Sequence, residues 1–162
     1  MWNRKRLTPP LLLLAIFMSQ DVFPQEKPYV VGVELLEYFP QYSYDDVYGY
    51  RGVYKEILDL FSSKSGHQFT YRALPIKRLY RDFLHNNVDF KYPDNANWKS
   101  TDKIGIPIRY SDPVVSYTDG VLVLPERKGL GITQLKKLST PRGFTPFVYL
   151  DLINEGSVEV TE

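Results

Sequence analysis

Residues 68–91 read QFTYRALPIKRLYRDFLHNNVDFK, and this stretch decides the fold. Gln68–Ala73 alternates apolar and polar side chains, which is typical of a β-strand with one buried face. Pro75 then suits the first turn of a helix, where a missing N–H breaks no hydrogen bond. This helix is predicted to bury five apolar side chains at helical spacing: Ile76, Leu79, Tyr80, Phe83 and Leu84. Asn86-Asn87 end it, and Val88–Lys91 is predicted to be the next strand.

The residues before this stretch show the same alternation. Tyr29–Val33, YVVGV, is uncharged and β-branched, which predicts a short buried strand. A tyrosine-rich loop is expected from Glu34 to about Tyr50. A helix ending at Ser65-Gly66 follows, with one apolar face made of Val53, Ile57, Leu60 and Phe61. Strands alternating with helices predict an α/β fold with a mostly parallel sheet, whose ligands bind at the carboxyl ends of the strands.

Beyond Lys91 the pattern is less regular. Tyr92–Lys103 is predicted to be a long loop at the carboxyl end of the third strand. Val121–Leu124 is apolar and follows a turn pair, which predicts a strand. Two short helices are expected, at residues 132–138 and 147–154, and a strand is expected to start at Val158.

The N-terminal residues resemble an export signal. A basic cluster at Arg4, Lys5 and Arg6 precedes an apolar run from Leu11 to Met18, which is far shorter than the about 20 residues that cross a bilayer. This layout predicts a signal peptide over residues 1–25, cleaved between Ser19 and Gln25, and hence a periplasmic protein. An uncleaved anchor or a buried N-terminal helix are the alternatives.

Composition narrows the classes of function. Loss of residues 1–25 removes three basic residues and one acidic residue, so the net charge falls from +1 to −1, which predicts no nucleic-acid binding. The chain has no cysteine, so disulfides are excluded, and its two histidines have no metal-ligand spacing. No nucleophile, zinc-protease or phosphate-binding motif is present, so we expect neither an enzyme nor a cofactor.

Four segments together resemble the bacterial extracellular solute-binding proteins of family 3, the amino-acid-type receptors of ABC importers. They are FPQYSY (39–44), GYRGVYKEILDLF (49–61), LPIKRLYRDFLHNNVDF (74–90) and YSDPV (110–114). The resemblance implies two α/β lobes of the type II periplasmic-binding-protein fold that close on a ligand. Residues 26–113 would then be lobe one, and residues 114–162 the crossing and a partial lobe two. It also implies a monomer whose partners are a small-molecule ligand and an ABC importer membrane component.

The resemblance places candidate ligand contacts in two loops. Tyr38, Phe39 and Tyr42 follow the first strand, where the family stacks an aromatic ring on the ligand; alternatively, they cover the sheet edge. The second loop contains Asn95, Trp98, Thr101 and Lys103. Trp98 is either a ligand platform or a hydrophobic plug.

One departure from the family concerns the ligand carboxylate. The family holds it with an arginine at the position of Ile104, and lysine lacks the planar fork of arginine, although Lys103 could replace it. Arg78, Glu34 and Glu37 could also face the ligand, or could be surface charges.

We therefore expect periplasmic binding of a small polar solute such as an amino acid. A truncated, nonfunctional remnant and a sensory or enzyme-associated binding lobe are the alternatives. Because lobe two is expected to be incomplete, we predict weak ligand binding, or none, by this chain alone.

Overall fold

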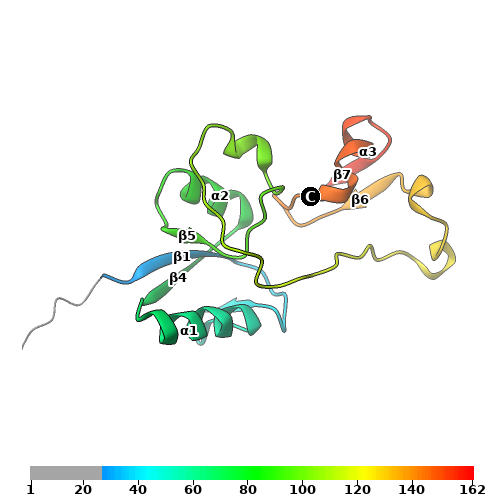
Figure 1. The fold of residues 1–162 in the computed structure, drawn as a ribbon. Coiled ribbons are helices and arrows are strands. Elements are labelled where there is room, and N and C mark those ends of the chain that lie inside the picture. The colour runs from blue at the N-terminus through cyan, green and yellow to red at the C-terminus, as the bar shows by residue number, and fades with distance from the viewer. Residues whose placement is uncertain (1–26) are drawn as a thin grey trace, which may run out of the picture.

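The computed structural model describes residues 27–162 and has a mixed α/β architecture with small, mostly parallel sheets (Figure 1). The predicted signal peptide lies outside the described residues. The strands are β1 (Tyr29–Glu34), β2 (Ser43–Asp45), β3 (Gly49–Arg51), β4 (Phe69–Leu74), β5 (Phe90–Lys91), β6 (Lys137–Ser139) and β7 (Glu159–Thr161). The α-helices are α1 (Val53–Ser65), α2 (Ile76–Leu84) and α3 (Leu150–Asn154). Across residues 27–162 no helix has the length and apolar character needed to cross a bilayer.

The central sheet has the strand order β4-β1-β5, and both pairings are parallel. β1 pairs with β4 over its whole length, from Tyr29 opposite Phe69 to Glu34 opposite Leu74. β5 is shorter and pairs through Lys91 opposite Gly32. The three predicted parallel strands are therefore confirmed, and their carboxyl ends lie at one edge of the sheet.

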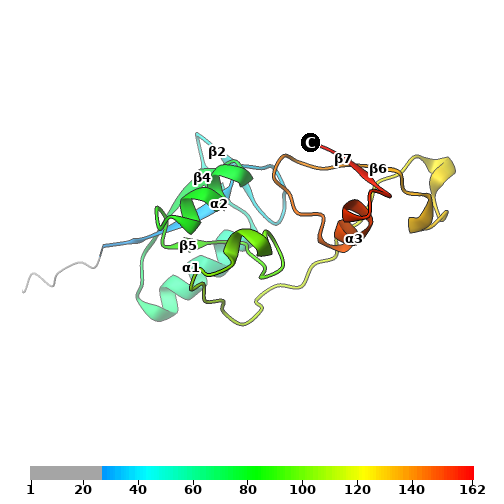
Figure 2. The same cartoon turned by 90° about the horizontal axis from the view of Figure 1, so that it is seen from above.

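The two faces of β1 pack against different helices, which lie on opposite sides of the sheet (Figures 1 and 2). Val31 and Val33 are buried in a cluster that includes Tyr54 of α1. Gly32 faces α2, and a Cβ at this position would lie 2.5 Å from Leu79 Cδ1. A larger residue here would force the buried Leu79 side chain to shift, so the glycine allows α2 to approach the central strand closely.

The predicted apolar face of α1 is confirmed only at Ile57, which packs against the buried core cluster. Val53, Leu60 and Phe61 are 44%, 57% and 51% exposed, whereas Tyr54 is buried. The helix is fixed at its start, because the Val53 and Tyr54 amides donate hydrogen bonds to the Pro40 and Gln41 carbonyls at 3.0 Å. This anchoring turns Tyr54 toward the sheet. The predicted end is confirmed, since Gly66 adopts a left-handed conformation after Ser65.

The predicted loop between Glu34 and Tyr50 contains an antiparallel hairpin, β2–β3. Asp45 closes its turn, because one carboxylate oxygen accepts hydrogen bonds from the Val47 and Tyr48 amides at 2.9 and 2.7 Å. Tyr50 of β3 is buried in the core cluster, and Tyr44 of β2 packs against it. The hairpin was missed because its residues are the Asp, Tyr and Gly types that loops share.

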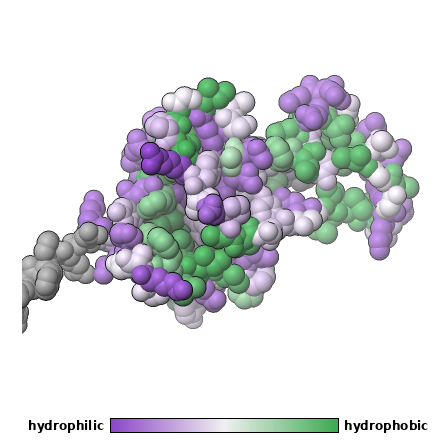
Figure 3. All heavy atoms as spheres, in the orientation of Figure 1, coloured by the Kyte–Doolittle hydropathy of each residue, from purple (hydrophilic) through white to green (hydrophobic). Residues whose placement is uncertain are grey.

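The C-terminal part of the chain, which we call the smaller unit, contains a second sheet, the parallel pair β6–β7. The predicted strand at Val121–Leu124 is wrong, because this segment is irregular and exposed, with Leu122 fully exposed. The predicted helix at 132–138 is also wrong: a 3-10 turn (Ile132–Gln134) precedes β6. The second short helix is confirmed as a 3-10 turn leading into α3. Figure 3 shows apolar side chains gathered on the surface of this unit.

Candidate functional site

Two charged side chains end neighbouring strands of the central sheet. Glu34 is the last residue of β1 and is 7% exposed, and Lys91 is the last residue of β5 and is 8% exposed. The loop after β5 brings Asp94 and Lys103 to the same place. We refer to Glu34, Lys91, Asp94 and Lys103 as the charge cluster.

The four charges are close enough to pair. Lys91 Nζ lies 3.2 Å from Asp94 Oδ1 and 3.7 Å from Glu34 Oε1. Lys103 Nζ lies 2.8 Å from Asp94 Oδ2. Two carboxylates and two ammonium groups cancel, so the cluster is neutral as a whole. Buried charges persist only when they are paired in this way.

Tyrosine hydroxyl groups complete the coordination of both carboxylates. Tyr42 Oη donates a hydrogen bond of 2.6 Å to Glu34 Oε2, and Tyr80 Oη donates one of 2.7 Å to Asp94 Oδ1. Lys91 Nζ also lies 4.5 Å from the centroid of the Tyr80 ring. Since Tyr80 belongs to α2 and Tyr42 precedes β2, the cluster joins the sheet to both of its flanking segments.

The environment shifts the pKa of several of these groups. Burial is the main cause that lowers the pKa of Lys91, and the Asp94 and Glu34 carboxylates act against it. Burial raises the pKa of Asp94, but Lys91, Lys103 and the Tyr80 hydroxyl outweigh it, so the net shift is downward. Burial, followed by the adjacent carboxylate, raises the pKa of both Tyr42 and Tyr80. Asp94 is therefore ionised, and both tyrosines are neutral donors, at neutral pH.

Lys103 has no donor left for a ligand. Its ammonium group donates hydrogen bonds to Asp94 Oδ2, the Asn95 carbonyl and Tyr110 Oη, at 2.8, 2.9 and 2.7 Å. A lysine ammonium has three N–H donors, and all three are used here. Lys103 instead ties the two ends of the 92–103 loop together.

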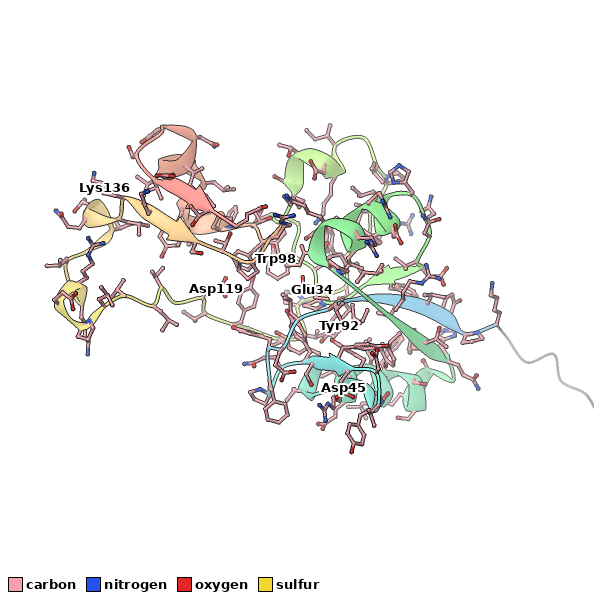
Figure 4. All side chains as sticks on the ribbon, turned by 180° about the vertical axis from the view of Figure 1, so that it is seen from behind. Glu34, Asp45, Tyr92, Trp98, Asp119 and Lys136 are labelled. Carbon is pink, nitrogen blue, oxygen red and sulfur yellow. The ribbon has the colours of Figure 1, made fainter. Side chains whose placement is uncertain are left out.

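Aromatic rings lie beside the charge cluster. The ring centroids of Trp98 and Tyr117 are 5.8 Å apart, and Lys91 Nζ lies 5.6 Å from the Trp98 centroid. The Tyr38 ring lies 5.6 Å from that of Tyr42, which is buried. We call Tyr38, Trp98 and Tyr117 the aromatic rim. In Figure 4, Trp98 and Glu34 lie near the point where the sheet unit meets the smaller unit.

The comparisons with known proteins leave the site to be interpreted from its own geometry. No family model, curated protein or solved structure gives a significant match to this chain. What the site can bind therefore follows from the charges, hydrogen bonds and rings described above.

The structure brings four of the predicted site residues together at the sheet edge. Tyr42 and Lys103 bond to the charge cluster, Trp98 lies over it, and the Asn95 carbonyl accepts a hydrogen bond from Lys103. Tyr38 adjoins them, because it forms an isolated β-bridge with Tyr42.

Three other candidates contribute less to this arrangement. Phe39 is 71% exposed, and Thr101 and Arg78 are also exposed. Lys103, one of the two lysines that could replace the missing arginine, makes only internal hydrogen bonds. Whether any of the predicted residues contacts a ligand remains a prediction.

Sequence reasoning missed half of the charge cluster. Lys91 and Asp94 were not singled out, and of the two interpretations given for Glu34, the surface charge is wrong, because Glu34 is buried. One sequence signal could have identified Glu34 and Lys91: each is a charged residue at the end of a predicted strand, and the two strands are neighbours in the sheet. Within residues 27–162, no group of three or more carboxylate or imidazole side chains could hold a metal ion.

Proposed function

We propose that this chain is a binding lobe of an exported solute-binding protein for a small polar solute. The observation that carries the proposal is that Glu34 and Lys91, which end two neighbouring parallel strands, pair at the carboxyl edge of the sheet, where the loops after β1 and β5 begin. Ligands of open α/β sheets bind at such an edge. The resemblance to family 3 solute-binding proteins supports the same location.

The charge cluster would position this site without contacting the ligand. Its ion pairs hold the start and the end of the 92–103 loop on the sheet, and so fix Trp98 in place. A loop already ordered before binding loses less conformational entropy when the ligand arrives. The solute would lie on the aromatic rim, outside the neutral cluster.

The smaller unit would supply the opposing surface. Tyr117 lies in the segment that leads from the sheet unit into residues 121–162, and its ring already contacts Trp98. Hinge closure of two lobes around a ligand would use this segment. In this proposal the loaded protein delivers its solute to an ABC importer in the membrane.

A ligand titration followed by NMR tests the proposal. Zwitterionic amino acids, organic amines and oligosaccharides would be added in turn to the 15N-labelled chain, up to about 10 mM, because a Kd of 1 mM corresponds to only about −4 kcal/mol. At least one class should shift the amide signals of residues 35–42 and 92–99 together with the Trp98 indole signal.

A matched pair of variants distinguishes specific binding from general adhesion to aromatic rings. Trp98→Leu should weaken binding several-fold, whereas Tyr48→Leu, which changes a side chain that is 73% exposed in the hairpin turn, should leave it unchanged. If no solute shifts the rim signals, or if both variants weaken binding equally, the proposal fails.

A further inference from the structure

The aromatic rim has an acidic neighbour that lacks a counter-charge. Asp119 is exposed and forms neither an ion pair nor a side-chain hydrogen bond within the described part of the chain. Asp119 follows Tyr117 by two residues in the sequence; after burial, its charge is the next cause that raises the pKa of Tyr117, and it contributes at Tyr54 as well. In Figure 4, Asp119 and Trp98 both lie toward the end of the sheet that faces the smaller unit.

The rim lacks the groups needed to grip a carboxylate. Ile104, at the position where an arginine was expected, is 79% exposed and uncharged. Lys103 uses all three of its N–H donors, and the side chain of Lys91 is 0% exposed. Lys99, beside Trp98, is the nearest basic residue in this loop by sequence, but a lysine lacks the planar fork that matches a carboxylate.

The rim offers what an organic cation needs. The faces of Trp and Tyr rings attract ammonium groups, and they do so more strongly where a carboxylate stands nearby and water is partly excluded. Trp98 and Tyr117 present two rings with centroids 5.8 Å apart at an interplanar angle of 53°, and Asp119 lies two residues after Tyr117 in the sequence. The charge cluster beneath is neutral and so does not oppose a positive ligand.

We propose that the aromatic rim binds an organic ammonium cation without a carboxylate, held by Trp98, Tyr117 and Asp119. This inference rests on the proposed function and specifies the class of solute that the site takes. The positive group would lie against the Trp98 and Tyr117 rings, and Asp119 would balance its charge.

The test compares three compounds of similar shape and different charge on the 15N-labelled full chain. Choline is the cation, 3,3-dimethylbutan-1-ol is its neutral isostere, and glycine betaine adds a carboxylate to the same ammonium group. The Trp98 indole signal, separated from that of Trp2 by a Trp2→Phe variant, reports binding. Choline should bind about 3- to 30-fold more tightly than the neutral alcohol, and also more tightly than glycine betaine.

The variant Asp119→Asn separates the charge from the ring contacts. It should weaken choline binding several-fold and leave binding of the neutral alcohol unchanged, whereas Asp46→Asn, in the β2–β3 turn, should change neither. Because Asp119 makes no side-chain hydrogen bond or ion pair in the described residues, the variant should fold normally, as its unfolding midpoint would show.

The possible results distinguish this inference from the broader proposal. Equal affinity for choline and the alcohol, tighter binding of glycine betaine, or no effect of Asp119→Asn would each overturn the cation assignment. If amino acids or oligosaccharides shift the rim signals while choline does not, the inference fails and the solute-binding function stands. If none of the solutes shifts them, both fail.

Discussion

Replacing Lys91 with methionine should destabilise the fold strongly. The substitution removes an ammonium group whose side chain is 0% exposed and which lies 3.2 Å from Asp94 and 3.7 Å from Glu34. Removing one partner of a buried ion pair leaves the other charge uncompensated and costs about 3–5 kcal/mol. Native domains are stable by only about 5–15 kcal/mol, so this variant should lose a large part of its free energy of unfolding.

Urea unfolding followed by circular dichroism measures this loss, and a surface lysine provides the control. Lys137 pairs with Glu159 at 3.0 Å, but its side chain is 72% exposed. Lys137→Met should therefore change the free energy of unfolding by only about 0–1 kcal/mol, because exposed ion pairs contribute little.

The pH dependence of the same measurement gives a second readout. In the natural sequence the pKa of Asp94 is lowered, so the stability this carboxylate contributes is present above its unfolded pKa of about 3.9 and is lost as the pH falls through its folded pKa. In Lys91→Met, the pKa of Asp94 should be higher than in the natural sequence, because burial raises it and the Lys91 charge that lowers it is gone. The difference in stability between the two proteins should therefore narrow as the pH falls from about 7 toward 5.

Two results would refute this reasoning about Lys91. One is a loss for Lys91→Met no larger than that for Lys137→Met at neutral pH. The other is a difference from the natural sequence that stays constant over this pH range. Either would mean that the Lys91 ammonium is solvated rather than enclosed between two carboxylates.

Three further predictions use urea unfolding midpoints. Gly32→Ala should cost about 1–3 kcal/mol, because the new Cβ would lie 2.5 Å from Leu79 Cδ1. Gly120→Ala should be nearly neutral, because a Cβ there has nothing within 4 Å. Equal effects of the two variants would contradict the packing of α2 on β1. Leu79→Ala should cost about 2–5 kcal/mol, because this side chain is 0% exposed, and Leu122→Ala should cost less than about 0.5 kcal/mol, because that side chain is 100% exposed. A large loss of stability for Leu122→Ala would mean that residues 121–124 are packed, as the sequence predicted. Tyr80→Phe should cost about 1–3 kcal/mol, because it removes the 2.7 Å hydrogen bond to a buried carboxylate; an unchanged midpoint would show that this bond is absent.

The regular part of the fold could be predicted because its pattern is local. The alternation at Phe69, Tyr71 and Ala73 and the helical spacing around Leu79 are direct consequences of strand and helix geometry, and all of these side chains are packed inward. The rotation of α1 could not be predicted, because it is set by hydrogen bonds to Pro40, which only the folded chain brings near.

The candidate site was harder to predict because long-range contacts form it. Lys91 and Glu34 are 57 residues apart in the sequence, and only the parallel pairing of β1 with β5 brings their side chains together. Trp98 and Tyr42 could be proposed because aromatic residues in loops at the carboxyl ends of strands are natural contacts for ligands. Lys103 was a predicted ligand contact and lies in the charge cluster, but its partners there were not foreseen.

The strand prediction at Val121–Leu124 failed for a different reason. Its β-branched and apolar residues favour a strand, but a strand also needs a neighbour with free backbone groups. In the described residues the nearest sheet, β6–β7, pairs only within itself. Propensity alone therefore predicted a strand that does not form.

The central claim is that the loop after β5 folds over an enclosed Lys91 at the carboxyl edge of the sheet. NMR observation of the Lys91 ε-methylene protons tests this most directly, because Lys91 Nζ lies 4.5 Å from the Tyr80 ring centroid and 5.6 Å from that of Trp98. We predict ring-current shifts of these protons and nuclear Overhauser effects to both rings. Ordinary solvent-exposed chemical shifts without contacts to either ring would contradict the account.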